Sequence, residues 1–114
     1  MWLFTVDGFF SVVKDNYCSD AELMVRARVR EDLERFCKRM AIDPGGILEL
    51  PEADYRFRIK VRRGRWVAYA GSMAYEIEYS NFKNTVDDHR RHMAYMECWR
   101  ALHDWQEAQT ENKA

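Results

Sequence analysis

Residues 55–62, Tyr-Arg-Phe-Arg-Ile-Lys-Val-Arg, alternate apolar and basic side chains with a period of two. Successive side chains of a β-strand point to opposite faces of the sheet, so this stretch predicts a half-buried strand with a cationic outer face. Tyr55 is expected on the apolar side with the core residues. The basic side carries Arg56, Arg58, Lys60 and Arg62.

Residues 24–29 repeat the pattern and place Arg26 and Arg28 on one side of a second strand. If both strands lie in one sheet in matching orientation, six positive charges share one face. A guanidinium group donates two parallel hydrogen bonds to phosphate or carboxylate, so this face predicts a site for an anionic ligand, nucleic acid or another charged partner. The alternative is a solvated face whose charges pair with Asp and Glu on adjacent strands or loops.

Hydrophobic periodicity and turn residues divide the whole chain into elements. The sequence predicts a hairpin of residues 2–6 and 9–14 around a type I′ turn at Asp7-Gly8, a strand at 23–29, a helix at 30–40, a short edge strand at 47–51, the strand at 55–62, a helix at 66–79 and a long helix from 81 to about 107. Gly71, inside the second helix, is expected to mark close packing on the sheet.

These elements predict an α+β fold. We expect an antiparallel sheet of four to five strands, in the order β-β-β-α-(β)-β-α-α, with helices mainly on one face. Residues 23–77 have the pattern of a ferredoxin-like half, which would make the two Arg-bearing strands neighbours. The length of 114 residues predicts a single domain over 1–114, with residues 109–114 as a frayed tail.

Composition excludes several classes of protein. A hydrophobic content of 47% is too high for a disordered chain, and no run approaches the ~18 apolar residues of a membrane span. The three cysteines are widely spaced, which argues against a disulfide framework or a thiolate zinc site, and Cys37 is expected to be a small core residue. We therefore expect a cytoplasmic protein that does not associate with membranes.

Charge is unevenly distributed along the chain. Residues 1–25 carry a net charge of −3, residues 26–65 carry +5 and residues 66–114 carry −3. A basic patch within a nearly neutral protein suits an anionic partner of limited extent better than general coating of nucleic acid.

Several segments carry a resemblance to known proteins. They are Met1-Trp2-Leu3-Phe4-Thr5-x-x-Gly8-Phe9-Phe10-Ser11-Val12-Val13, Val25-Arg26-Ala27-Arg28-x-x-x-Asp32-Leu33-Glu34, Ala53-Asp54-Tyr55-Arg56-Phe57-Arg58 and Tyr79-x-Asn81-Phe82-Lys83. In these segments, which span most of the sequence, the chain resembles a family of small uncharacterised bacterial proteins with no assigned activity. The resemblance implies a shared fold and no catalytic residues.

The long C-terminal helix has two apolar stripes. One runs from Phe82 through His89 to Met96, and the other contains Trp99, Leu102 and Trp105. The two stripes lie on different sides of the helix, so only one of them can pack on the core. Aromatic side chains that cluster on the surface are typical of protein interfaces. We therefore expect a homodimer with these three residues in the subunit interface; the alternative is a helix bent back over the domain.

No motif indicates catalysis, a metal or a cofactor. Asp88 and His92 share one helix face, but a metal site needs three or four ligands. We therefore expect a non-enzymatic interaction protein without a cofactor, whose partner is another protein. An inhibitor of a host nucleic-acid-handling machine, of the anti-CRISPR kind, fits the size and charge. The alternative is a small regulator that binds nucleic acid or an anionic ligand on the basic sheet face.

Overall fold

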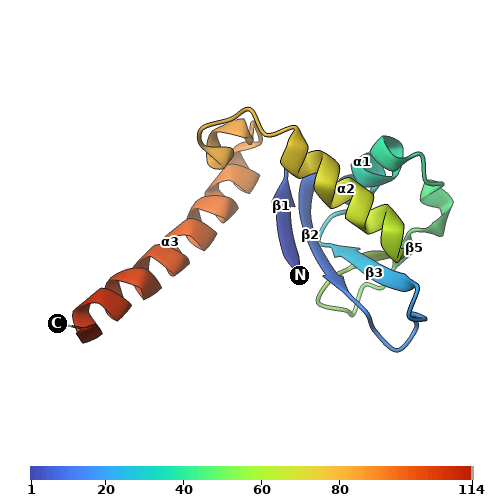
Figure 1. The fold of residues 1–114 in the computed structure, drawn as a ribbon, viewed down its shortest axis with the longest axis horizontal. Coiled ribbons are helices and arrows are strands. Elements are labelled where there is room, and N and C mark those ends of the chain that lie inside the picture. Colours follow the sequence, from blue (N-terminus) through green and yellow to red (C-terminus); the bar gives the residue numbers. More distant parts are fainter. Residues whose placement is uncertain (114) are drawn as a thin grey trace. The chain divides into compact units, whose positions relative to one another are not determined.

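The computed structural model describes the backbone of residues 1–113 and the side chains of residues 1–111. Its elements are β1 (Trp2–Thr5), β2 (Gly8–Val13), β3 (Glu22–Ala27), α1 (Arg30–Met40), the 3-10 turn η1 (Pro44–Gly46), β4 (Leu48–Glu49), β5 (Phe57–Arg62), α2 (Arg63–Tyr75), the 3-10 turn η2 (Phe82–Thr85) and α3 (His89–Lys113) (Figure 1). The predicted α+β class and order of elements are confirmed. The chain forms two compact units that divide after Ile77, the first with the sheet, α1 and α2, and the second with η2 and α3.

The five strands form one antiparallel sheet in the order β1-β2-β3-β5-β4. Strands β3 and β4 are both antiparallel to their common neighbour β5, so they run parallel to each other. Helix α1 joins β3 to β4, and β5 lies between them. This is the split βαβ arrangement of ferredoxin-like folds. The short β4 therefore completes the predicted ferredoxin-like half, and the two Arg-bearing strands β3 and β5 are neighbours as expected.

The β1–β2 hairpin turns one residue earlier than the sequence predicts. Thr5 pairs with Gly8, so the loop consists of Val6 and Asp7, and Gly8 is the first residue of β2. The φ angle of Gly8 is 150°, a value that favours glycine. A Cβ atom at Gly8 would also overlap the buried carboxyl group of Asp32 on α1. The close approach of α1 to the hairpin thus explains why position 8 is a glycine, whereas the sequence pattern predicts that Gly8 is part of the turn.

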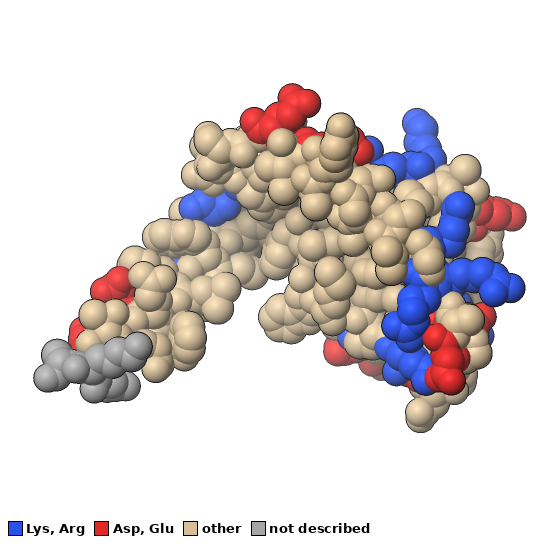
Figure 2. Space-filling model, viewed as in Figure 1, with Lys and Arg blue, Asp and Glu red and all other residues tan. Residues whose placement is uncertain are grey.

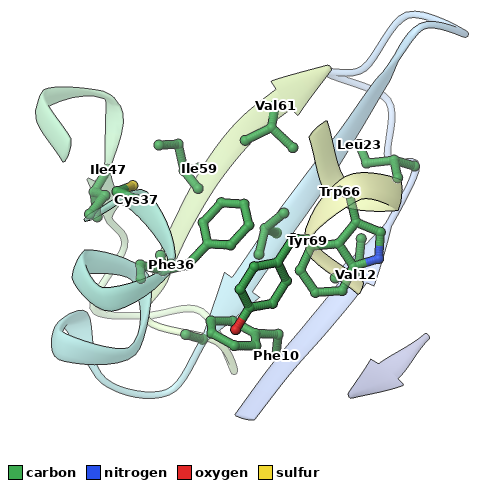
Figure 3. Close-up of a cluster of buried hydrophobic side chains, with 13 residues drawn as sticks. Phe10, Val12, Leu23, Phe36, Cys37, Ile47, Ile59, Val61, Trp66 and Tyr69 are labelled. Carbon is green, nitrogen blue, oxygen red and sulfur yellow. The ribbon is translucent and has the colours of Figure 1, made fainter. Parts of the chain in front are cut away.

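Helices α1 and α2 cover one face of the sheet. Aromatic side chains fill the space between the layers, and the rings of Phe36 and Tyr69 lie 4.8 Å apart at 82° (Figure 3). Cys37 is buried in the same core and lies beside Ile47, as Figure 3 shows, so it is the small core residue that the sequence predicts. The buried cluster comprises Phe10, Val12, Leu23, Val25, Ala27, Leu33, Phe36, Cys37, Ile47, Ile59, Val61, Trp66 and Tyr69.

Helix α2 presents its buried side to the sheet through Trp66, and its other side is exposed and apolar. Gly71, expected to pack on the sheet, lies on the exposed side, where an added Cβ would meet no atom within 4 Å. Val67 and Tyr75 are exposed on the same helix. Figure 2 shows the resulting uncharged surface over α2, with Lys and Arg gathered toward the right-hand edge of the view.

The last helix starts at His89, eight residues later than predicted. The side chain of Asn81 accepts a hydrogen bond from the Lys83 amide at 3.1 Å and so begins the separate turn η2. The Asp88 carboxylate accepts from the Arg91 amide at 2.8 Å, which satisfies a free donor in the first turn of α3. The segment therefore forms two separately capped elements, η2 and α3, where periodicity predicts a single long helix.

The predicted core stripe of the last helix is consequently incorrect. His89, expected on this stripe, is exposed, whereas Tyr95 is buried and its ring stacks on that of Phe82 in η2 at 6.0 Å. Helix α3 also continues through residues 109–113, which were expected to form a frayed tail; residue 114 lies outside the described residues. Among the residues described, no helix has the length and apolar character needed to cross a membrane.

Candidate anion-binding site

The face of the sheet opposite α1 and α2, here the open face, carries the side chains that alternate with the core. Strand pairing aligns Trp2 with Ser11, Ser11 with Arg26, and Arg26 with Arg58. These four residues form a row across four neighbouring strands, which we name the central row.

Residues flanking the central row divide the open face into two halves. Phe4 and Phe9 pair with each other on β1 and β2, and the Phe9 ring lies 6.1 Å from Trp2, edge to face. On β3 and β5, Met24 pairs with Lys60, and Glu22 pairs with Arg62. The open face is therefore aromatic over β1 and β2 and cationic over β3 and β5.

Tyr55 does not continue the alternation of β5, which begins at Phe57. The turn before β5 carries the Tyr55 ring to the open face, within 6.4 Å of the Phe9 ring. The guanidinium carbons of Arg26 and Arg28 lie 4.6 and 4.1 Å from the centroid of the Tyr55 ring, so both make cation–π contacts. The expectation that Tyr55 is a core residue is therefore wrong: it is 4% exposed and buried outside the core cluster.

These contacts gather five of the six predicted basic residues, which we name the basic cluster: Arg26, Arg28, Arg58, Lys60 and Arg62. The sixth, Arg56, precedes the first residue of β5 and is exposed, so strand register assigns it to neither face.

Neutral oxygen atoms hold the guanidinium groups in place. Arg26 Nη2 donates to Ser11 Oγ at 2.7 Å, and Arg28 Nη1 donates to the carbonyl oxygen of Asp54 at 2.6 Å. Arg58 Nη2 donates to the carbonyl oxygen of Tyr55 at 3.1 Å. Arg58 Nε is buried and has no hydrogen-bond partner among the described residues. The groups are thus oriented while their charges stay uncompensated.

No described carboxylate forms an ion pair with a member of the basic cluster. Glu22 is the acid placed opposite Arg62 by strand pairing, and its carboxylate accepts from the Ser19 amide at 2.9 Å. That hydrogen bond first, and then the charges of Lys60 and Arg62, lower the pKa of Glu22. Glu22 thus offsets part of the charge of Lys60 and Arg62, as the alternative of a face neutralised by its own acids expects, whereas Arg26, Arg28 and Arg58 have no ion pair with a described carboxylate.

A second cluster of titratable groups lies at the β1–β2 turn, on the helix side of the sheet. Asp7 accepts hydrogen bonds from Arg39 Nε at 2.6 Å, Arg39 Nη2 at 3.0 Å and Tyr69 Oη at 2.9 Å. Burial alone would raise the pKa of Asp7, but the bonds from Arg39 and Tyr69 and the charges of Arg39 and Arg35 outweigh it and lower that pKa. Burial, and then the Asp7 charge, raise the pKa of Tyr69. Because Tyr69 is fully buried, this cluster anchors the hairpin and offers no accessible chemistry.

The described residues contain no group of three His, Cys, Asp or Glu side chains that could hold a metal ion. His92 Nδ1 lies 3.0 Å from the carbonyl oxygen of Lys83, a contact that joins η2 to α3.

Helix α3 exposes the three residues predicted for a subunit interface. The Trp99 ring already has two contacts within its own unit: Lys83 Nζ lies 4.4 Å from the ring centroid, and the His103 ring stacks on it at 4.9 Å. Leu102 and Trp105 are 69% and 63% exposed.

Comparison with known proteins provides no independent evidence, since no family model, no curated protein and no solved structure matches this chain. The candidate site therefore depends on the geometry of the open face alone.

Proposed function

We propose that the first unit is a non-enzymatic binding module that holds a phosphate-bearing polyanion on the basic cluster. The observation that supports the proposal best is the gathering of five cationic side chains, none of which forms an ion pair with a carboxylate of the described residues. Like charges repel one another, so such a cluster costs free energy unless an anion compensates it. The buried Nε of Arg58 is a further donor that no described residue uses, whereas buried polar groups normally have a hydrogen-bond partner.

A charge-removal experiment tests this function. The variant Arg58→Gln/Lys60→Gln/Arg62→Gln removes three charges from the basic cluster. The matched control Lys38→Gln/Arg90→Gln/Arg100→Gln removes three charges from exposed positions elsewhere. Both variants should fold, because Lys60, Arg62 and the three control positions are exposed, and substitutions at such sites usually change stability by no more than about 0.5 kcal/mol each. Arg58 is partly buried and donates one hydrogen bond, whose loss costs about 0.5–1.5 kcal/mol.

The measurement is the salt concentration that elutes each protein from immobilised linear polyphosphate. We expect the basic-cluster variant to elute at much lower salt than wild type and the control to elute close to wild type. Equal elution of wild type and the basic-cluster variant would refute the proposal, as would an equal loss in both variants, because net charge alone would then explain retention.

A second candidate function is self-association through α3, favoured by the exposure of Leu102 and Trp105. Large exposed apolar side chains in one stripe resemble the anchors of protein interfaces. We expect wild type to sediment as a dimer and Leu102→Gln/Trp105→Gln to sediment as a monomer with unchanged helix content. The control Val67→Gln/Tyr75→Gln, on the exposed side of α2, should remain dimeric. A wild type that stays monomeric at high concentration would exclude this interface.

Inhibition of a host nucleic-acid-handling machine stays a prediction from size and charge. A face that binds polyanions would suit such an inhibitor, and it would equally suit a small nucleic-acid-binding regulator.

A further inference from the structure

We infer that the polyanion is single-stranded nucleic acid, with phosphates over the cationic half of the open face and bases over the aromatic half. This inference rests on the proposed function, because it names the ligand class of the same face. The central row is the main support for this inference, because this row places an exposed indole and two guanidinium groups in one line across the sheet.

The first step concerns the indole. Trp2 is 71% exposed, although it lies within a regular strand whose neighbour Leu3 packs against the core. Its contact with Phe9 is edge to face, with the ring planes at 81°. An exposed, edge-supported indole can accept a nucleobase by stacking, as aromatic side chains do in single-strand binding proteins.

The second step concerns the junction of the two halves. Ser11 lies between Trp2 and Arg26 in the central row, and its small hydroxyl accepts from the Arg26 guanidinium. Arg26 therefore reaches over β2 toward the strand that carries Trp2. Neighbouring strands lie about 4.8 Å apart, so the backbones at Trp2 and Arg26 are roughly 10 Å apart. That separation suits one nucleotide, whose base would lie at Trp2 and whose phosphate would lie at Arg26.

The third step concerns the direction of the ligand. Arg58, Lys60 and Arg62 alternate along β5, so their side chains follow one another at about 6.8 Å on the same face. A ligand backbone along β5 would meet successive cations, whereas a backbone across the strands would pass from cations to aromatic rings. The bound strand is therefore expected to run along β3 and β5.

The aromatic half also selects single strands over duplexes. In a duplex the flat faces of the bases are stacked on one another, and only base edges are accessible in the grooves. Stacking on Trp2 needs an unpaired base whose face is free. Free phosphate or polyphosphate would use the basic cluster alone and leave Trp2 without a role.

Three probes of equal length separate these possibilities. They are a 12-nucleotide oligo(dT), an abasic oligonucleotide with the same 12-residue backbone and charge, and a 12-base-pair duplex. We expect wild type to bind oligo(dT) at least tenfold more tightly than the abasic strand, and more tightly than the duplex. This comparison needs no variant, so it decides the question whatever happens to the folding of mutants.

A pair of variants locates the stacking. Loss of one stacking side chain typically weakens single-strand binding by 1–3 kcal/mol, which corresponds to about 5- to 150-fold, so Trp2→Ala should weaken oligo(dT) binding within that range. The same variant should leave abasic binding unchanged. Tyr75→Ala, which removes an aromatic ring that is 91% exposed on α2, should change neither affinity.

The two proposals fail differently in these assays. Equal affinity for oligo(dT) and the abasic strand, preferential duplex binding, or an unchanged Trp2→Ala affinity would overturn the single-strand inference and leave polyanion binding intact. Absence of binding to polyphosphate and to all three probes would overturn the proposed function itself.

Discussion

Replacing Gly8 with alanine should destabilise the first unit strongly, because two separate costs meet at this residue. At a φ angle of 150°, a side chain costs about 1–3 kcal/mol of backbone strain. The new Cβ would also lie within 2.6 Å of Asp32 Oδ1, so the Asp32 carboxylate would have to move. Its Oδ2 accepts the Phe9 amide at 3.1 Å, and loss of a buried hydrogen bond costs about 1–3 kcal/mol. The expected loss of unfolding free energy is thus about 2–6 kcal/mol.

Urea unfolding followed by circular dichroism measures this loss. With a urea dependence of about 1–3 kcal/mol per molar, the midpoint should fall by at least about 0.7 M. Hydrogen exchange of the peptides that cover β2 and β3 assigns the transition to the first unit.

Gly71→Ala is the matched control for Gly8→Ala. Gly71 is helical and its added Cβ meets open space, so alanine should stabilise α2 by about 0.5–1 kcal/mol. A Gly8→Ala midpoint equal to that of wild type would refute the account of the close approach between α1 and the hairpin.

Two further predictions concern the core side of the sheet. Asp7→Asn should lower the free energy of unfolding at pH 7, and the difference in this free energy between variant and wild type should shrink below about pH 4. The folded-state pKa of Asp7 is lowered, so the ionised side chain stabilises the fold above its unfolded-state pKa of about 3.9, and this stabilisation is lost as pH falls through the folded-state pKa. Urea unfolding at pH 7 and at pH 3 measures the difference. Ile59→Asp should unfold the first unit, because an unpaired carboxylate in the core costs several kcal/mol; a cooperative melt close to wild type would show that Ile59 does not face the core.

Sequence patterns could predict most of the first unit because its strands obey the simple alternation of a half-buried sheet. The helix at residues 30–40 was located to the residue, since acidic residues at its start, basic residues at its end and its apolar spacing all agree. Alternation also predicted that Arg26 and Arg58 each lie on the polar side of their own strand, and the direct pairing of these two residues in the adjacent strands β3 and β5 gives them a common face.

Periodicity gave incorrect results where a local hydrogen bond or a turn interrupts a regular element. Tyr55 fits the alternation of the following strand, yet a turn places it on the opposite face, beneath two arginines. The last helix was predicted too early because apolar spacing continues through η2, while the side-chain caps at Asn81 and Asp88 divide the segment. The capping residues were visible in the sequence, and giving them more weight than periodicity would have located both boundaries.

The central row could not be predicted from the sequence because it depends on the register of the hairpin. The expected turn at Asp7-Gly8 gives a different register from the observed pairing of Thr5 with Gly8. The expected turn would pair Trp2 with Val13 and Phe4 with Ser11, a shift of two residues in the partner strand that leaves each side chain on its face and places Phe4 in the row in place of Trp2. The composition of the central row is thus a consequence of where the chain turns.

The buried Asp7 cluster links the stability of the hairpin to the composition of the proposed site. Bonds from Arg39 and Tyr69 fix Asp7 on the helix side, and the contact between Gly8 and Asp32 fixes the next residue. With the turn held at these points, Leu3 packs against the core and Trp2 must point to the open face. A slip of β1 alone by one residue against β2 would exchange these roles and would leave the basic cluster without an exposed indole beside it. The residues that stabilise the turn therefore also keep the indole of Trp2 on the open face, although none of them lies on that face.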